Sequence, residues 1–165
     1  MPDKIYANQL AMDTINSMME NNRLAHSFLI FGDNGLGKKS IAEYFAMKML
    51  CENKTDTPFG KCRACRNIRN HVHPDVIWVE HSGKLQGFSA ETIRNICSEA
   101  FVTPATAERK IYIFADADQI TVQAQNSLLK LIEEPPDFTY FIFTAKDKNS
   151  FLATIISRVI AIGVS

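Results

Sequence analysis

The sequence predicts an α/β fold in which helices flank a parallel five-stranded sheet. Five short apolar segments alternate with helical patterns along the 165 residues, and this alternation is typical of parallel strands joined by helical crossovers. A glycine-rich segment at 32–40 follows the first apolar run and precedes a helical pattern. This length is sufficient for one domain with a substantial core, so we expect a single domain over residues 1–165.

The first half of the chain contains two of the expected strands. Apolar residues at helical spacing predict an opening amphipathic helix at 8–27, and the run SFLIF predicts a buried strand at 27–31. A helix is expected at 40–51, after the glycine-rich segment. Residues 52–67 are polar and contain a proline and a glycine, so we expect an excursion from the core there. The run DVIWVE predicts the second strand at 75–80.

The second half repeats the alternation of helix and strand. Ser89 is the expected N-cap of a helix at 89–102. A second helix at 121–134 is expected to stop before Pro135, because proline cannot continue a helix. Apolar runs predict the third strand at 110–116, the fourth at 140–145 and the fifth at 159–164. A short helix is expected at 150–158, just before the fifth strand.

The composition is that of an ordinary globular protein without a strong net charge. Lys plus Arg number 18 and Asp plus Glu number 18, so the formal net charge is zero, which argues against a strongly basic nucleic-acid binder. No apolar stretch is long enough to span a membrane, and the first ten residues lack the apolar core of a signal peptide. We therefore expect a cytoplasmic protein without a membrane partner, whose four cysteines are thiols or metal ligands.

Residues 32–40, GDNGLGKKS, match the phosphate-loop pattern G-x-x-x-x-G-K-[ST] except at its last position. Glycines at 32, 35 and 37 let backbone N–H groups approach a phosphate, and the following helix N-terminus adds partial positive charge. Lys38 is expected to reach the outer phosphates. Gly32, Gly35, Gly37 and Lys38 thus predict a site for ATP or phosphate; a glycine turn without a ligand is the alternative.

Two parts of the usual magnesium site are altered. Lys39 stands where a Ser or Thr should ligate the ion, and Ser40 is one residue too late, since one residue turns a helix by about 100°. Ala115 follows the third strand where an Asp usually stands, and Asp116 comes next. We therefore expect weak or absent nucleotide binding, with Lys39, Ser40 and Asp116 lining a degenerate site, and a poor ATPase or none.

Four segments resemble the first domain of bacterial clamp-loader subunits of DNA polymerase III, which are AAA+ members of the P-loop NTPases. They cover nearly the whole chain and read RLAHSFLIFGDNGLGKKS, HPDVIWVE, NSLLKLIEEPPDFTYFIFTA and TIISRV. The ATPase subunits of that family keep Thr or Ser after the lysine and an acidic pair after the strand. Because Lys39 and Ala115 depart from this pattern, the chain most resembles the delta-prime type.

The resemblance implies a role in DNA replication, within a hetero-oligomeric ring of gamma/tau-type and delta-type subunits. The ring's other partners would be the sliding clamp and primer-template DNA. It implies that residues 1–165 form the AAA+ large, RecA-like domain, and that the helical lid and collar lie outside this chain. Arg158, of the pair Ser157–Arg158, would then be an arginine finger directed at the ATP of a neighbouring subunit, although Val159 replaces the family's common cysteine.

A cysteine-containing insertion is expected at about 51–72. Cys62 and Cys65 have C-x₂-C spacing, and Cys51 lies eleven residues before Cys62. The family that the chain resembles has four cysteines here, and the second is lost in Pro58–Phe59–Gly60. A structural zinc site needs four ligands. Two interpretations stay open, a zinc site that uses Cys51, Cys62 and Cys65, or a metal-free loop.

Two histidines and one further cysteine were weighed beside this set. His71 or His73 could supply a fourth zinc ligand, and a plain loop entering the second strand is the other interpretation of these residues. Cys97 falls in a helical pattern, where we expect a buried small apolar residue.

Other functions remain as alternatives. The second hypothesis is an active P-loop ATPase, such as a gamma/tau-type motor subunit, or a nucleotide kinase. A kinase would need an Arg-rich lid and a hydroxyl after the loop lysine, and the chain has neither. A zinc-dependent DNA-binding module is the third, and the zero net charge weighs against it. Glu133 and Glu134 are adjacent on a helix and do not face one another, so a carboxylate pair for acid–base catalysis is not expected.

Overall fold

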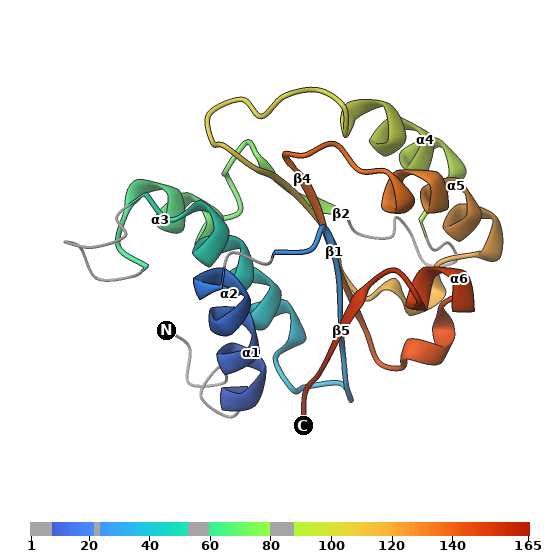
Figure 1. Ribbon diagram of the computed structural model, residues 1–165, viewed down its shortest axis with the longest axis horizontal. Coiled ribbons are helices and arrows are strands. Elements are labelled where there is room, and N and C mark those ends of the chain that lie inside the picture. Colours follow the sequence, from blue (N-terminus) through green and yellow to red (C-terminus); the bar gives the residue numbers. More distant parts are fainter. Residues whose placement is uncertain (1–7, 22–23, 53–59, 80–87) are drawn as a thin grey trace.

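Five parallel strands form the centre of the molecule (Figure 1). A computed structural model describes residues 8–21, 24–52, 60–79 and 88–165. The strands lie in the order β2-β3-β4-β1-β5, and every neighbouring pair is parallel. Their bounds are Ser27–Phe31 for β1, Val76–Val79 for β2, Lys110–Phe114 for β3, Thr139–Ala145 for β4 and Ile160–Gly163 for β5. The predicted fold class is confirmed.

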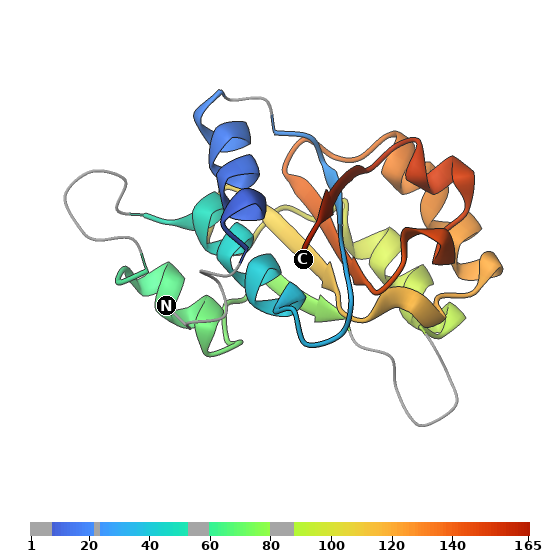
Figure 2. The ribbon, with the colours of Figure 1, turned by 90° about the horizontal axis from the view of Figure 1, so that it is seen from below.

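Helices cover both faces of this sheet. One layer contains α1, α2 and α3, and the other contains α4, α5 and α6, as the two perpendicular views show (Figures 1 and 2). The first layer consists of Gln9–Glu20, Lys38–Leu50 and Arg63–Arg69, and the second of Ala90–Glu99, Val122–Glu133 and Ala153–Ile156. Two short 3₁₀ helices, Ala117–Gln119 and Lys148–Ser150, follow β3 and β4.

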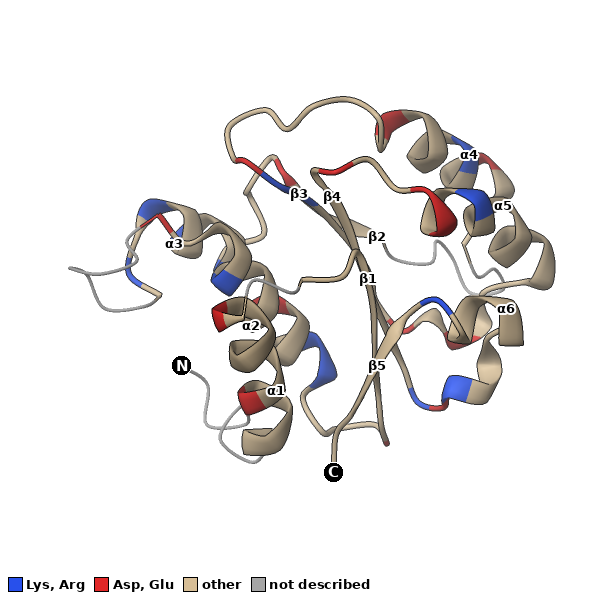
Figure 3. Cartoon of the chain, in the orientation of Figure 1, with Lys and Arg blue, Asp and Glu red and all other residues tan. Residues whose placement is uncertain are grey.

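Alternate residues of the strands fill two separate cores. In β3, Ile111 and Ile113 pack into the core beneath α1, α2 and α3, whereas Tyr112 and Phe114 pack beneath α4, α5 and α6. Successive side chains of a strand point to opposite faces, so a strand buried on both faces must be apolar throughout. Charged residues are accordingly found mainly on helices and loops, as Figure 3 shows. Both positive and negative residues occur on each side of the sheet.

Helix ends follow the expected local chemistry. Ser89 caps α4, because its side chain accepts a hydrogen bond from the Thr92 N–H at 3.1 Å. Thr121 caps α5 in the same way through the Ala124 N–H. The last residue before Pro135 is the C-cap of α5, as the proline stop predicts. Among the described residues, no helix is long and apolar enough to cross a membrane.

Two expected elements differ from the structure. The opening helix is shorter than predicted and ends at Glu20 rather than at residue 27. Part of the expected excursion is instead the helix α3, whose Cys65 and Ile68 side chains are fully buried in the first core. Cys62 is the N-cap of this helix and accepts a hydrogen bond from the Cys65 N–H at 3.3 Å. A thiol thus takes the capping role that the sequence patterns reserve for Ser, Thr, Asp or Asn.

A buried carboxylate fixes the loop before β3 to the start of β2. Asp75 is only 2% exposed. Its oxygens accept hydrogen bonds at 2.5–3.0 Å from the N–H groups of Ala105, Thr106 and Ala107 and from the Thr106 hydroxyl. Burial raises the pKa of this carboxyl, but the three N–H donors outweigh burial and hold the pKa below its usual value.

This cluster predicts a pH-dependent loss of stability in Asp75→Asn. The amide keeps one acceptor oxygen, so we expect the variant to lose about 2 kcal/mol of unfolding free energy at pH 7. A lowered folded-state pKa means that the wild-type advantage is present above the unfolded pKa, about 3.9, and is lost as the pH falls through the folded value. Urea unfolding at pH 7 and pH 3 measures both. The exposed Asp137→Asn is the control; an equal loss at both pH values would contradict the prediction.

Candidate functional site

The glycine-rich loop joins β1 to α2 at the carboxyl edge of the sheet, where ligands of open α/β sheets bind. Gly37 is the N-cap of α2 and has φ +80°, a left-handed conformation that favours glycine. A Cβ atom on Gly32 would lie 2.5 Å from a side-chain carbon of Val164. The loop therefore needs glycine at one position for its backbone angles and at the other for close contact with the end of β5.

The side chain of Lys38 hydrogen-bonds to the backbone of the loop. It is 7% exposed, and its ammonium donates hydrogen bonds to the carbonyl oxygens of Gly32 at 2.5 Å and Asp33 at 3.0 Å. An ammonium group has three N–H donors, so one donor is left for a ligand in the loop. The predicted phosphate-binding lysine thus also holds the loop in shape.

Asn8 also supports the loop, and sequence reasoning missed it. Its side-chain amide donates to the Leu36 carbonyl at 2.7 Å, and its side-chain oxygen accepts from the Ser165 N–H at 3.3 Å. The residue is buried. A polar residue just before a helix reads as an ordinary cap, so nothing local in the sequence distinguishes this role.

Lys39 forms an ion pair with Asp116. The Lys39 Nζ atom lies 3.0 Å from Asp116 Oδ2, and the two side chains are 51% and 48% exposed. Lys39 is in the first turn of α2, and Asp116 follows β3. Both residues were assigned to the degenerate site separately, and the structure brings their charged groups into contact.

Asp116 is held in an uncommon backbone conformation. It has φ +51° and ψ +55°, in the left-handed region that non-glycine residues seldom adopt. Its N–H donates a hydrogen bond to the hydroxyl of Thr144 at 2.9 Å. Thr144 is fully buried in β4, and it is a second residue that sequence reasoning missed. The one feature of the sequence that could have revealed it is a hydroxyl residue inside the apolar run YFIFTA.

The residues around this ion pair do not fit a magnesium ion. Mg²⁺ requires oxygen ligands in near-octahedral geometry. Ala115 offers no ligand, and the carboxylate of Asp116 already contacts the ammonium of Lys39. A hollow of about 340 Å³ remains above the loop, lined by Asn34, Gly35, Gly37, Lys38, Lys39, Ser40 and Asp116. The hollow suits an anion better than a metal cation, because it contains two lysines and one aspartate.

Arg158 lies far from this loop. It is in the turn between α6 and β5, which is at the amino edge because all the strands are parallel. Its guanidinium pairs with Glu133 at 2.9 Å and donates to the Thr154 carbonyl at 2.8 Å, and its side chain is 38% exposed. The loop after β1 is at the opposite edge, so Arg158 and the chain's own loop lie at different ends of the strands.

Three of the four cysteine thiols gather near the end of α2. The sulfur atoms of Cys51, Cys62 and Cys65 lie within 4.8 Å of one another, and those of Cys51 and Cys62 are 3.8 Å apart. Tetrahedral zinc with Zn–S bonds of about 2.3 Å would place two sulfurs about 3.8 Å apart. The predicted set thus comes together with a spacing that suits three of the four ligands of a structural zinc ion.

The thiols of this cluster differ in acidity. Burial raises the pKa of Cys62, but hydrogen bonds from the N–H groups of Cys65 and Glu52 and from the neighbouring thiols lower it to about 7. Burial and the neighbouring thiols raise the pKa of Cys65 well above its usual value. Since the thiolate is the form that binds metal, Cys62 is the thiol best prepared for a cation.

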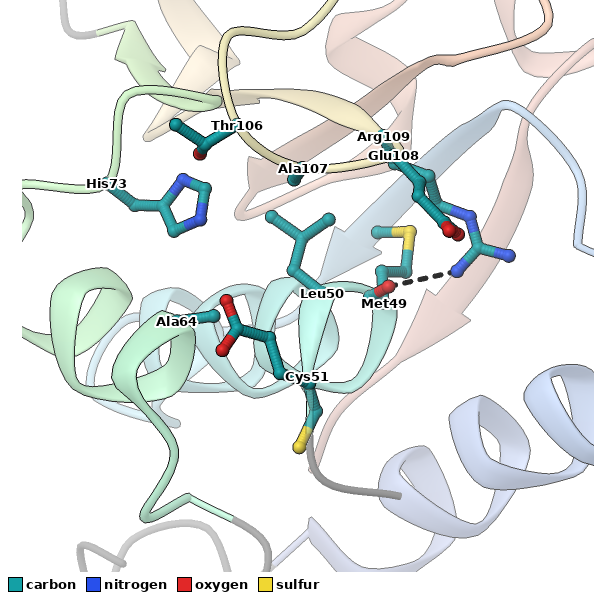
Figure 4. Close-up of a pocket in the computed structure, with 10 residues that line it drawn as sticks. Met49, Leu50, Cys51, Ala64, His73, Thr106, Ala107, Glu108 and Arg109 are labelled. Carbon is teal, nitrogen blue, oxygen red and sulfur yellow. Dashed lines mark hydrogen bonds between the residues drawn. The ribbon is translucent and has the colours of Figure 1, made fainter.

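Neither histidine lies in the thiol cluster. His73 accepts a hydrogen bond from the Asp75 N–H at 3.0 Å, and the sulfur of Cys51 points away from it in Figure 4. His71 stacks on Trp78 with ring centres 4.3 Å apart. The structure therefore does not support a histidine as the fourth ligand. Pro58 and Phe59, where the family pattern has its second cysteine, lie outside the described residues, and Cys97 is only half-buried, beside α5.

Comparisons with known proteins assign the chain to a family. The family model described as "DNA polymerase III, delta subunit" matches residues 7–165. The delta' subunit of DNA polymerase III from Bacillus subtilis is 33% identical over 147 residues, which cover 89% of this chain and 44% of that protein. The chain belongs to the DNA polymerase III clamp-loader family.

Within this family, sequence identity does not separate the types of subunit. The tau subunit of DNA polymerase III from Bacillus subtilis is 32% identical, over 88% of this chain and 25% of that protein. The chain thus spans less than half the length of these two relatives. Both kinds of clamp-loader relative therefore match at nearly the same level, and the residues of the loop must distinguish them.

Solved structures show the same AAA+ fold. A gamma-subunit-related protein of DNA polymerase III from Thermotoga maritima has a TM-score of 0.68 at 21% identity, covering 92% of this chain and 45% of that one. RuvB from the same organism has a TM-score of 0.53 at 12% identity, covering 96% of this chain and 44% of that one. At such identities the likeness concerns the fold alone.

The thiol geometry of this clamp-loader family member predicts zinc binding. Protein prepared without a histidine tag should contain close to one zinc per chain, and Cys62→Ser should lower this value below about 0.2, since each thiolate is a ligand of the same ion. Cys97→Ser is the matched control and should keep the wild-type content. Elemental analysis after gel filtration provides the measurement, and a zinc-free wild-type protein would favour the metal-free loop.

Proposed function

We propose that this chain is the nucleotide-fold domain of a delta-prime-type clamp-loader subunit of DNA polymerase III, acting in DNA replication in the cytoplasm. In this role it does not hydrolyse ATP itself and supports the hydrolysis of a neighbouring subunit. The observation that carries the proposal is the ion pair between Lys39 and Asp116, with nitrogen and oxygen 3.0 Å apart. An ATPase of this fold needs a magnesium ion near the residues that this pair occupies.

The same pair favours the delta-prime type over the gamma/tau type. A motor subunit requires a hydroxyl after the loop lysine and an acidic residue after β3 to position magnesium. Here the two positions contain Lys39 and the buried Ala115. Loss of both ligands, together with an ammonium on the remaining carboxylate, supports a site without hydrolysis.

Arg158 is proposed as the residue that acts on the neighbour. A guanidinium is permanently charged and forms a planar fork suited to phosphate oxygens. Arg158 lies at the amino edge, away from the chain's own loop, and is partly exposed. In the isolated domain Glu133 holds the guanidinium at 2.9 Å, so a neighbouring phosphate would have to replace one exposed carboxylate.

The proposed partners follow from the family. Relatives are named as delta', tau and gamma subunits of DNA polymerase III, so we propose a hetero-oligomeric ring with gamma/tau-type and delta-type subunits. The sliding clamp and primer-template DNA would be contacted through this complex. Residues 1–165 would supply its AAA+ large domain, and the lid and collar would belong to parts of the subunit outside this chain.

An active ATPase is the alternative that the loop itself supports, because the loop is well formed and Lys38 retains a free donor. The proposed function predicts otherwise. The chain should show no magnesium-dependent turnover above background, whereas a competent enzyme works on the order of 1 per second or faster. Phosphate release with ATP and Mg²⁺ measures this. Turnover that Lys38→Ala abolishes would contradict the proposal, since that variant removes the loop lysine and controls for a contaminating ATPase.

A second prediction concerns Arg158→Ala in a reconstituted clamp loader with ATPase-competent neighbours. Assembly should persist, and DNA- and clamp-stimulated hydrolysis at the adjoining site should fall at least about tenfold, since arginine fingers supplied in trans are worth 10³–10⁵ in GTPases. Single-turnover hydrolysis after gel filtration of the complex provides the measurement.

Glu133→Gln is the matched control for this experiment. It removes the ion-pair partner and keeps the guanidinium, so hydrolysis at the adjoining site should stay near the wild-type rate. Unchanged hydrolysis in an intact Arg158→Ala complex would contradict the proposed role of Arg158 and leave it a surface charge at the end of a short helix.

A further inference from the structure

The Lys39–Asp116 ion pair lies beside positions 39 and 115, where the ligands of a divalent cation usually stand in this fold. Lys39 comes from the helix that follows the loop, and Asp116 from the turn after β3, so the pair connects two elements at the carboxyl edge. Asp116 adopts its left-handed conformation with its N–H on the buried Thr144 hydroxyl. The backbone from which the carboxylate extends is therefore fixed to the sheet, and the carboxylate itself pairs with the lysine.

The charges around the hollow also favour an anion over a divalent cation. Lys38 and Lys39 face one acidic residue, Asp116, among the residues that line it. An added divalent cation would lie beside the Lys39 ammonium and would be repelled by it. A phosphate group would instead meet the remaining Lys38 donor and the first N–H groups of α2, which have no intrahelical partner.

We propose that the Lys39 ammonium replaces the divalent cation of this site, so that the loop binds polyphosphate free of magnesium, and magnesium opposes that binding. The ligand class is a magnesium-free di- or triphosphate group. Asp116 acts here as the partner that holds Lys39 when no anion is present. The inference rests on the proposed loss of hydrolysis, because a magnesium-dependent ATPase could not use the site in this way.

Inorganic pyrophosphate tests the inference without a contribution from a nucleotide base. Calorimetric titration of the chain in EDTA should detect binding. Lys39→Met should weaken it about 3- to 10-fold, since an exposed charge contributes modestly. Asp116→Asn should tighten it by a similar factor, because the lysine is no longer partly neutralised. Lys130→Met, an exposed lysine in the last turn of α5, is the control and should bind like the wild type.

Magnesium distinguishes the inference from ordinary metal-assisted binding. Adding Mg²⁺ should weaken pyrophosphate binding by the wild type, whereas the double variant Lys39→Thr with Ala115→Asp should bind more tightly with Mg²⁺ than in EDTA. Thermal unfolding of each variant verifies that it is folded.

Three results would overturn the inference: no pyrophosphate binding by the wild type in EDTA, weaker binding by Asp116→Asn, or tighter binding by the wild type with magnesium. Failure of the proposed function would instead appear as ATP turnover, which these titrations do not measure.

Discussion

Parallel pairing of β1 with β4 and of β4 with β3 is the constraint on which the candidate site depends. It places the carboxyl ends of the three strands at one edge, so the loop after β1, the turn after β3 and the end of β4 meet there. Their residues are far apart in the sequence, as Lys39 and Asp116 illustrate. Without the shared strand direction, no local pattern would bring the Lys39 ammonium to the Asp116 carboxylate and the Thr144 hydroxyl to the Asp116 N–H.

The same constraint separates two kinds of chemistry. The carboxyl edge contains the glycine loop, and the amino edge contains Arg158, because this residue precedes β5 instead of following it. The domain thus has the two lysines of the glycine loop at one edge and a partly exposed guanidinium at the other. Under the proposed function, this separation would allow a subunit without hydrolysis of its own to contribute to the hydrolysis of a neighbour.

Sequence patterns predicted the parts of this molecule that local chemistry determines. The five strands, the capping by Ser89, the stop before Pro135 and the glycine loop follow from apolar periodicity and backbone rules, and the structure confirms them. The helix α3 was missed because seven residues with three apolar or cysteine positions carry too weak a helical period.

Contacts between distant residues were beyond such patterns. The roles of Asn8 and Thr144 and the ion pair of Lys39 depend on strand register and on which elements are neighbours. The thiol cluster is an intermediate case. Its three members were predicted from spacing, whereas the exclusion of His71 and His73 required their actual partners, Trp78 and the Asp75 N–H.

The contact between Gly32 and the end of β5 ties the glycine loop to the last strand. Val164 donates its N–H to Phe31 and leaves no space for even one carbon on Gly32, while Asn8 bridges Leu36 and the Ser165 N–H. The end of β5 therefore packs against one end of the loop and is linked to the other through Asn8, so the positions of all three are coupled.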